Sequence, residues 1–415
     1  MIKAIARPPG ALFLLYLSSF VLSFGQGMVL PALPLIVTEF EISIVAVAQV
    51  ITVYALGRFI AFMPAGVLLD RLGSRFAVVA APAIITVSLL AVALQPSYPL
   101  LLLAMFFAGG AEAIWNLGRE IAGVDLVRPD QRGRLMSGFM GTSTMGQAVG
   151  AGFGGLLLEV SSLQLLFLFY ALLALGVGAF SYFGRNADSN RLVRVSPPAT
   201  GAGAKWFSSF NLPALVRGIA PAARRMFLVL VLATVVMTMY RMLLQAMLPL
   251  YAGSHLHFSP SQIGFLFSIM GTVVFAMTIP GGLIIDKLGR KWATIPSTAL
   301  PIVAFVLIPF SDTFLQLAAL VVILGVANGL ALGSIAVSTY DIAPPESRGR
   351  LQGVRRTSAE VGGICGPLFG GVIAGASNPG IPFLVIAPIL FLTTLMLIFG
   401  TRETLVKGRQ RAVTS

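Results

Sequence analysis

The 415-residue sequence contains one cysteine and two histidines. The single Cys365 excludes an internal disulfide and any metal site built from paired cysteines. His255 and His257 lie close together, but the sequence offers them no further ligands, so we expect no metal ion and no cofactor. No Gly-Lys-Ser or Gly-Lys-Thr phosphate-binding loop occurs, which argues against ATP hydrolysis. Paired histidines and carboxylates within apolar segments are also lacking, so we expect no enzyme activity.

Charged residues are scarce as well. They make up 10% of the chain, whereas soluble globular proteins have about a quarter. Hydrophobic residues make up 57%, and the mean hydropathy is +0.92. This composition excludes a soluble globular protein. The apolar runs are continuous over about 20 residues rather than alternating, which favours membrane-spanning helices over a β-barrel. We therefore predict an all-α polytopic membrane protein with twelve transmembrane helices.

Acidic residues are outnumbered, with 15 Asp and Glu against 28 Lys and Arg. This excess does not indicate a nucleic-acid partner, because most basic residues fall in the even-numbered connections between apolar runs and in the two tails. By the positive-inside rule, both termini are expected to be cytoplasmic in an integral protein of the plasma (inner) membrane. The first run follows Lys3 and Arg7 without a cleavage signature, so it is predicted to be a retained span.

The sequence does contain an internal repeat. The segment 66–75 returns as 282–291, at one offset of 216 residues that also holds far outside this loop. The two copies pair Gly66 with Gly282, Asp70 with Asp286, Arg71 with Lys287, Gly73 with Gly289, Ser74 with Arg290 and Arg75 with Lys291. We predict an N-terminal six-helix bundle over 1–183, a cytoplasmic linker over 184–224, and a C-terminal six-helix bundle over 225–415 with a short cytoplasmic tail. Both aspartates are expected to accept hydrogen bonds from the start of a neighbouring helix.

Two of the predicted spans are rich in glycine. Gly150, Gly154 and Gly155 of the fifth span correspond to Gly366, Gly370 and Gly371 of the eleventh. Small residues at every fourth position let helices approach closely, so both spans are predicted to form tight helix contacts that also suit a sliding interface.

The six-plus-six arrangement, the Gly-x-x-x-Asp-Arg-x-Gly-x-Arg loop with its copy, and the glycine-rich fifth span resemble the major facilitator superfamily of secondary transporters. The resemblance implies two bundles around a central cavity that opens alternately to the two sides of the membrane. It also implies a gating role for the loop, in which Asp70 contacts the eleventh span and stabilises the outward-open state.

The glycine run of the fifth span is similar to the antiporter motif of exporters in this family. Ala151 replaces the proline of that motif, and the form with proline occurs in the other half at Pro367. Met105 occupies the place of the arginine that proton-coupled exporters carry early in the fourth span. The resemblance therefore favours export, with any proton-coupling group at another position.

Five basic residues fall inside or at the ends of apolar runs, and they are Arg58, Arg119, Arg241, Arg355 and Arg356. A charge at the centre of a membrane helix costs about 2.5–3.5 kcal/mol, so such residues should face a cavity or pair with an acid. The acidic candidates for such pairs are Glu112, Glu120 and Glu360. We expect Arg356 to lie at the cytoplasmic surface.

The fourth span carries the most informative polar face. Glu112, Trp115, Asn116 and Arg119 follow the spacing i, i+3, i+4 and i+7, which places them on one side of a helix. We predict that this face lines the cavity, with a static structural ion pair as the alternative.

Arg58 lies at a depth similar to that of Glu112, so a buried pair is expected, and Glu112 could exchange a proton when the pair breaks. In the seventh span, Arg241 and Gln245 share a second candidate face. Further cavity candidates are Gln26, Tyr54, Gln147, Asn328, Arg355 and Glu360.

These features predict a secondary active transporter that works by alternating access. We expect proton-coupled efflux of small amphipathic or drug-like molecules by a monomer in the lipid bilayer. One alternative is an uptake symporter or uniporter for an organic anion, which the excess of arginines over acids favours. The other is a non-transporting receptor on a transporter scaffold.

Overall fold

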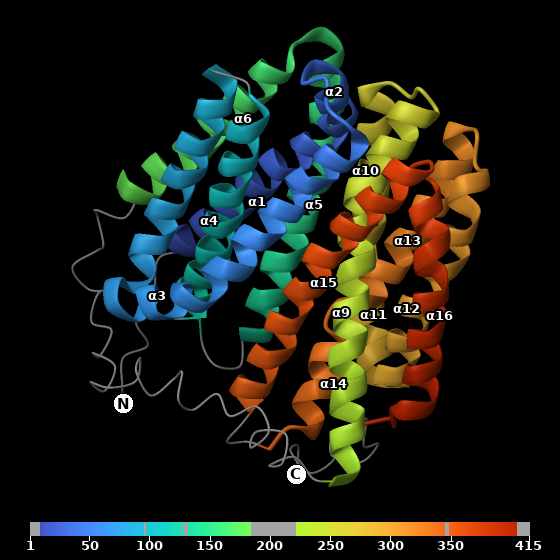
Figure 1. Ribbon diagram of the computed structural model, residues 1–415. Coiled ribbons are helices and arrows are strands. Elements are labelled where there is room, and N and C mark those ends of the chain that lie inside the picture. The colour runs from blue at the N-terminus through green and yellow to red at the C-terminus, as the bar shows by residue number, and fades with distance from the viewer. Residues whose placement is uncertain are drawn as a thin grey trace.

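The computed structural model describes residues 9–94, 97–124, 126–127, 132–183, 221–344 and 348–404, apart from some side chains, those of Asp70 and Arg75 among them. All regular structure within these ranges is helical (Figure 1). Most of the predicted linker, residues 184–220, lies outside them. The second half begins with a helix at Pro221, four residues before the predicted boundary.

The first half contains α1 (Pro9–Val29), the 3₁₀ turn η1 (Leu30–Ala32), α2 (Leu33–Glu39), α3 (Ile44–Leu94), α4 (Tyr98–Val124), α5 (Arg132–Val160) and α6 (Leu163–Phe183). The second half contains α9 (Pro221–Leu250), the π-helical turn η3 (Tyr251–His255), α10 (Pro260–Ala276), α11 (Thr278–Leu283), the π-helical turn η4 (Ile284–Leu288), α12 (Arg290–Leu307), the 3₁₀ turn η5 (Ile308–Phe310), α13 (Phe314–Ala331), α14 (Ser334–Ile342), α15 (Arg348–Ala376) and α16 (Ile381–Gly400).

Eleven segments of the described chain are helical, long and apolar enough to cross a membrane. They correspond to the predicted spans except for the fifth, α5, which is rich in glycine, serine and threonine. Helix α5 nevertheless packs between α1 and α10 as part of the bundle. The prediction of an all-α polytopic membrane protein is confirmed.

The repeated loop turns the chain at a glycine in both copies. Gly73 has φ 78° and ψ 164°, and it separates the two spans that make up α3. Gly289 has φ 129° and ψ 159°, and it lies directly before α12. Residues other than glycine rarely adopt such positive φ values, so only glycine makes these turns without strain. The first span is interrupted at the 3₁₀ turn η1, which begins at Leu30 and contains Pro31.

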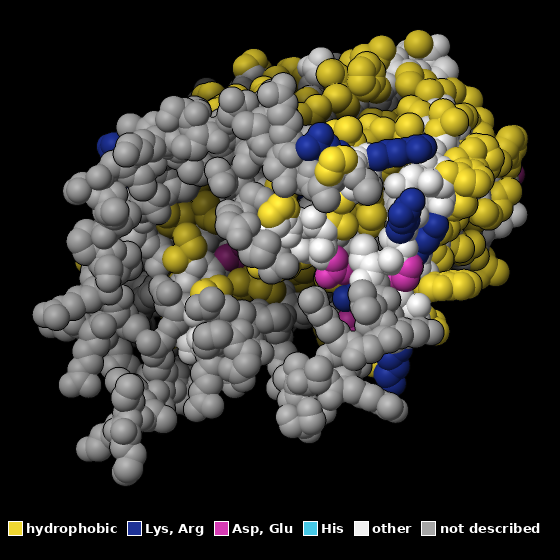
Figure 2. Space-filling view, turned by 90° about the horizontal axis from the view of Figure 1, so that it is seen from below, with side chains coloured by type: hydrophobic (Ala, Val, Ile, Leu, Met, Phe, Trp, Pro, Cys, Tyr) yellow, Lys and Arg dark blue, Asp and Glu magenta, His cyan; other side chains and the backbone are white. Residues whose placement is uncertain are grey.

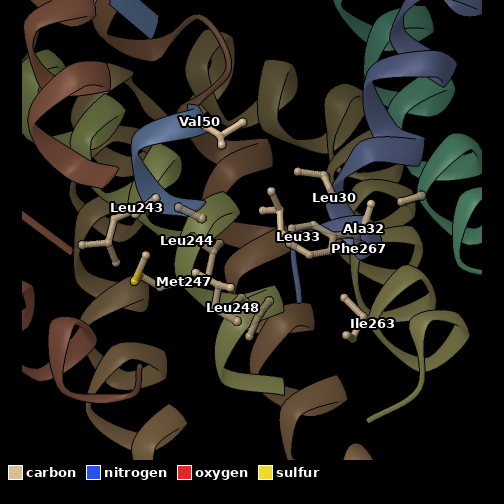
Figure 3. Packing of buried hydrophobic residues seen from close by; sticks show 14 of the residues in the cluster. Leu30, Ala32, Leu33, Val50, Leu243, Leu244, Met247, Leu248, Ile263 and Phe267 are labelled. Atoms are coloured by element: carbon tan, nitrogen blue, oxygen red, sulfur yellow. The ribbon is translucent and has the colours of Figure 1, made fainter. Parts of the chain in front are cut away.

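The two halves meet at the end of the molecule that carries α2, which we call the upper end; α9 begins and α16 ends at the lower end (Figure 1). At the upper end, Leu30 and Leu33 of the first half lie among Leu244, Leu248 and Phe267 of the second (Figure 3). These buried side chains form one continuous apolar core, so the upper end is closed between the halves.

Two helix pairs, related by the internal repeat, extend this contact. In the pair α3 and α15, which we call the first seam, added Cβ atoms at Gly371 and Gly375 would collide with Ala48 and Val45. Two other glycines of α15, Gly362 and Gly366, face the backbone of α9 within the second half. Helix α15 therefore uses separate glycine rows for its own half and for the opposite half.

The pair α5 and α10, which we call the second seam, follows the same plan. Gly150 and Gly154 of α5 pack against α1, whereas Gly152 and Gly155 face α10 of the other half. At the upper end of this seam, Ser261 donates a hydrogen bond to the carboxylate of Glu159. The close helix contacts predicted from the glycine pattern are therefore present on both spans.

Candidate functional site

A cluster of charged side chains joins the halves on the first seam. The guanidinium of Arg58 on α3 places Nη2 3.0 Å from Oε1 of Glu360 on α15. Its Nη1 lies 3.8 Å from Oε2 of Glu112 on α4. The side chain of Arg58 is 27% exposed, and those of Glu112 and Glu360 are 13% and 12% exposed. One arginine is thus shared by two mostly buried carboxylates, one from each half.

Glu112 has two further donors. The hydroxyl of Tyr54 donates to Oε2 of Glu112, and Nδ2 of Asn116 donates to Oε1 at 3.2 Å. The contact between Arg58 and Glu112 that the sequence predicts is therefore present, together with a hydrogen-bonded support from the same half. The partner of Arg58 in the opposite half, Glu360, is a contact that the sequence analysis did not foresee.

Glycines bring α3 and α4 close enough to build this cluster. A Cβ atom at Gly57 would collide with the carbonyl oxygen of Phe106, and one at Gly109 would collide with that of Tyr54. The two helices interlock at these positions, which fixes Tyr54 and Arg58 opposite Glu112. A single helix pair thus positions every member of the cluster that belongs to the first half.

The predicted polar face of α4 divides into two parts. Glu112 and Asn116 belong to the cluster, whereas Trp115 and Arg119 are buried at 3% and 7% exposure. Arg119 donates from Nη1 to Ser143 at 3.1 Å, and its guanidinium carbon lies 4.8 Å from the ring centroid of Phe139. Its Nε has no hydrogen-bond partner among the described residues. Arg119 is therefore packed against α5, away from the Arg58 cluster.

The second half contributes a different set of polar side chains. Tyr240 is buried and donates to Oδ1 of Asn328 at 3.0 Å, which joins α9 to α13. Arg241 is exposed, with no ion pair to a described residue. Arg241, Gln245 and Leu248 share one helix face, and Leu248 lies in the contact with the first half. The register therefore directs Arg241 toward the first half, below the upper contact.

The remaining cavity candidates lie outside the cluster. Gln26 and Gln147 are half-buried on α1 and α5, and the Gln147 carbonyl lies against Gly27. Arg355 donates to Gln352 at 2.9 Å. Arg356 is 45% exposed and lies 3.3 Å from Glu120 of α4, so it forms a second, more exposed ion pair between the halves.

The two copies of the repeated loop differ in what the structure describes. The Asp70 and Arg75 side chains lie outside the described set, whereas Arg71 is exposed and Gly66 has open space around it. In the second copy Asp286 and Lys287 are exposed, and Gly282 likewise has open space. The gating role of Asp70 therefore remains a prediction.

The start of α12 in the second copy is capped by a residue beyond α16. The carboxylate of Glu403 accepts hydrogen bonds at 3.0 Å from the backbone nitrogens of Arg290 and Lys291. Arg290 also pairs with Asp341 at 3.1 Å, and Lys291 donates to the carbonyl of Thr401. A carboxylate at a helix start and an ammonium at a helix end both complement the helix dipole. We predicted such a capping role for Asp286, whereas at the start of α12 Glu403 has it.

No group of His, Cys, Asp and Glu side chains in the described ranges could hold a metal ion. Figure 2 looks onto the lower end, where Lys and Arg side chains gather and an acidic side chain is visible inside a recess. Charged groups buried between two related helical bundles are typical of membrane transporters. The site and the fold together define this class of protein.

The comparisons identify the family. The Major Facilitator Superfamily model matches residues 15–244 and 230–413, so the chain belongs to this superfamily. It is 23% identical over 375 residues to the Uncharacterized MFS-type transporter MJ1560 of Methanocaldococcus jannaschii, covering 87% of this chain and 90% of the relative. It is 22% identical over 366 residues to the Quinolone resistance protein NorA of Staphylococcus aureus, covering 87% and 89%.

A third relative matches a shorter part of the chain. The Probable sulfoacetate transporter SauU of Cupriavidus necator is 31% identical over 144 residues, which are 35% of this chain and 34% of the relative. The protein is therefore an integral membrane protein of a transporter family that acts on small molecules, and the family is not one of enzymes.

Proposed function

We propose that this protein exports small amphipathic or drug-like molecules in exchange for protons, by alternating access. It lies in the plasma membrane, and its lower end and both termini face the cytoplasm. The observation that carries the proposal is the Arg58 cluster, because it ties the two halves together through an ion pair that a proton can break. The quinolone-resistance relative, matched over 87% of the chain, supports export of drug-like molecules. The basic side chains at the lower end support the orientation.

In the proposed cycle, the described arrangement is closed at the upper end. Opening that end separates α3 from α15 and therefore breaks the contact between Arg58 and Glu360. A buried charge that loses its partner is strongly disfavoured, so the change requires either a proton or a substrate that compensates the lost contact. This requirement is what would couple substrate movement to the proton gradient.

The test is transport by the purified protein in liposomes with an imposed pH gradient. The fluorescent quinolone norfloxacin and the dye ethidium serve as probes. Proton-coupled export predicts that an acidic lumen drives probe uptake with release of luminal protons, above the level in protein-free liposomes. Uptake that is independent of the pH gradient would contradict proton exchange, and binding of either probe without flux would indicate a receptor.

A second candidate is transport of an organic anion. Arg241 favours it, because this exposed arginine faces the first half without an ion pair to a described carboxylate. The sulfoacetate-transporter relative supports the same candidate over a third of the chain. Sulfoacetate in the same liposomes separates the two proposals, since an anion carrier moves it with protons or without them, and a drug exporter does not move it.

A further inference from the structure

We propose that Glu360, and not Glu112, is the carboxylate that carries the exchanged proton, and that its protonation releases the first seam. The inference rests on the proposed proton exchange and names the residue responsible for it.

The two carboxylates have unequal support. Glu112 accepts hydrogen bonds from Tyr54 and Asn116 and also contacts Arg58, and all three partners belong to its own half. Glu360 has Arg58 as its only hydrogen-bond or ion-pair partner among the described residues. Hydrogen bonds to a carboxylate stabilise its charged form. Glu112 therefore keeps its partners in any arrangement of the halves, whereas Glu360 keeps its partner only while the halves are joined.

The contact lies on a line of close packing between the halves. Going down the first seam from the upper end, Val45 meets Gly375 and Ala48 meets Gly371. Further along the same two helices, Ala55 lies beside Gly363, and the pair of Arg58 and Glu360 follows. Separation of α3 and α15 at the upper end therefore pulls this pair apart. Arg58 remains with Glu112, because Gly57 and Gly109 lock α3 and α4 together.

Glu360 would then be an isolated carboxylate within the membrane. Its side chain is 12% exposed in the described arrangement. Removing one partner from a buried ion pair leaves an uncompensated charge, which is strongly unfavourable, whereas a neutral carboxylic acid avoids this penalty. Protonation of Glu360 therefore stabilises the arrangement in which the seam is open.

No other described titratable group takes over the role of Arg58. Helix α9 presents Val235 and Met239 to the neighbouring stretch of α15, and α16 contains no titratable side chain. The charged groups on the surrounding elements are otherwise engaged or directed elsewhere: Glu112 and Tyr54 contact each other, Glu120 pairs with Arg356, Arg355 binds Gln352, Asp341 pairs with Arg290, and Arg241 faces the first half. Protonation of Glu360 therefore acts on the contact with Arg58.

The proton balance of the step is simple. A bound substrate opens the seam and breaks the hydrogen bond from Arg58 to Glu360. A proton from water on the upper side then adds to a carboxylate oxygen of Glu360, while Arg58 keeps its own protons and its positive charge. When the halves close again at the upper end, Arg58 returns to Glu360, and the proton leaves to water on the lower side. The empty, unprotonated carrier stays tied, so at neutral pH the seam opens mainly with substrate bound, which couples the return of the proton to the outward movement of substrate.

The experiment measures the opening of the upper end without any substrate. The full-length protein carries Cys365→Ala, and nitroxide labels are placed at Leu94→Cys and Leu315→Cys, two exposed positions at the upper end of opposite halves. Pulsed electron paramagnetic resonance reports the distance between the labels in liposomes at pH 8.0 and pH 5.5. The variants are Glu360→Gln, Glu112→Gln and, as a matched control at an exposed site, Glu39→Gln.

In the labelled parent we expect a longer distance to gain population as the pH falls. Glu360→Gln should show this longer distance at pH 8.0, about tenfold more populated than in the parent, with little further response to acid. Glu112→Gln and Glu39→Gln should keep the pH response. The proposal is overturned if the parent does not respond, if Glu360→Gln responds as the parent does, or if Glu112→Gln abolishes the response.

A second variant covers the case in which Glu360→Gln is not monodisperse on size-exclusion chromatography. Glu360→Asp keeps a titratable group on a shorter side chain, so the tie to Arg58 is weaker and the midpoint of the distance change should move to higher pH. An unchanged midpoint would overturn the proposal. The distance measurement uses no substrate. A failure to transport norfloxacin or ethidium would therefore refute export of these probes without changing the measured effect of Glu360 on the opening of the upper end.

Discussion

The two seams between the halves are copies of one ancestral helix pair, yet among the described side chains only the first contains an ion pair. Arg58 and Glu360 meet on the first seam, and the repeat places Val274 and Thr144 at the corresponding positions of the second. Both seams use glycine to bring helices of opposite halves into contact. The packing is therefore inherited from the duplication, and the ion pair is a property of one copy alone.

This difference separates two roles that a seam can have. Glycine rows let the helices approach, and on the second seam they do so without an ion pair among the described side chains. A buried ion pair adds little net stability, because the desolvation of its charges offsets much of their attraction. Its presence on one seam is best understood as a means of making the opening of that seam depend on protonation or substrate.

The largest expected effect comes from removing the arginine of the charged seam. Arg58→Ala leaves Glu112 and Glu360 without their shared cation and should lower the free energy of unfolding by about 3 kcal/mol or more. Val274→Ala, at the corresponding position of the second seam, is the matched control and should cost about 2 kcal/mol. Thermal unfolding of the purified variants in detergent measures both. Equal losses would show that the charged seam has no special role in stability.

A smaller effect is expected from filling the glycine rows. Gly371→Ala places a methyl group against the Cβ of Ala48, and overpacking of this kind typically costs about 1–3 kcal/mol. Gly152→Ala meets the hydroxyl of Ser268, which can rotate away, so this variant should be the milder one. Melting temperatures of the two variants provide the comparison. A greater loss for Gly152→Ala would mean that the second seam is the tighter contact.

The exposed ion pair near the lower end should contribute less to stability than the Arg58 cluster or the glycine contacts. Arg356 is 45% exposed and pairs with Glu120, and exposed ion pairs are typically worth about 0–1 kcal/mol. Arg356→Gln should therefore change the melting temperature far less than Arg58→Ala does. If the two losses match, the connection between the halves depends on the lower pair as much as on Arg58.

The smallest effect concerns the upper end of the second seam. Hydrogen bonds from Ser261, and to a lesser extent from Ser259, lower the pKa of Glu159 below its ordinary value. Because the pKa is lowered, this contact contributes stability above the ordinary pKa and loses it as the pH falls through the lowered value. Glu159→Gln should reduce the melting temperature slightly at pH 7 and not at pH 3, with Glu39→Gln as control. A difference that grew in acid would contradict this assignment.

Much of the fold could be predicted from the sequence because it depends on local patterns. The apolar runs specify the helices, the repeat specifies two halves, and the glycines at 73 and 289 specify the turns after the second and eighth spans. The contact of Arg58 with Glu112 was also predictable, because adjacent helices of one half hold residues of similar depth side by side.

The rest depends on how distant segments align, which no local pattern records. Glu360 meets Arg58 only because of the register between α15 and α3, which belong to different halves. Arg119 shares a helix face with Glu112, yet it lies two turns further along, where α5 is close enough to cover it. Glu403 follows the last span in a polar segment, and nothing nearby in the sequence indicates that it caps a helix.

The cap supplied by Glu403 has a consequence for how the protein is made. The first turn of α12 binds a carboxylate that the ribosome adds 113 residues after Arg290. Throughout the synthesis of α13, α15 and α16, the beginning of α12 must therefore rely on water or lipid headgroups for its backbone donors. A chain truncated just before Glu403 would therefore contain every span of the second half, but the backbone nitrogens of Arg290 and Lys291 would lack their carboxylate partner.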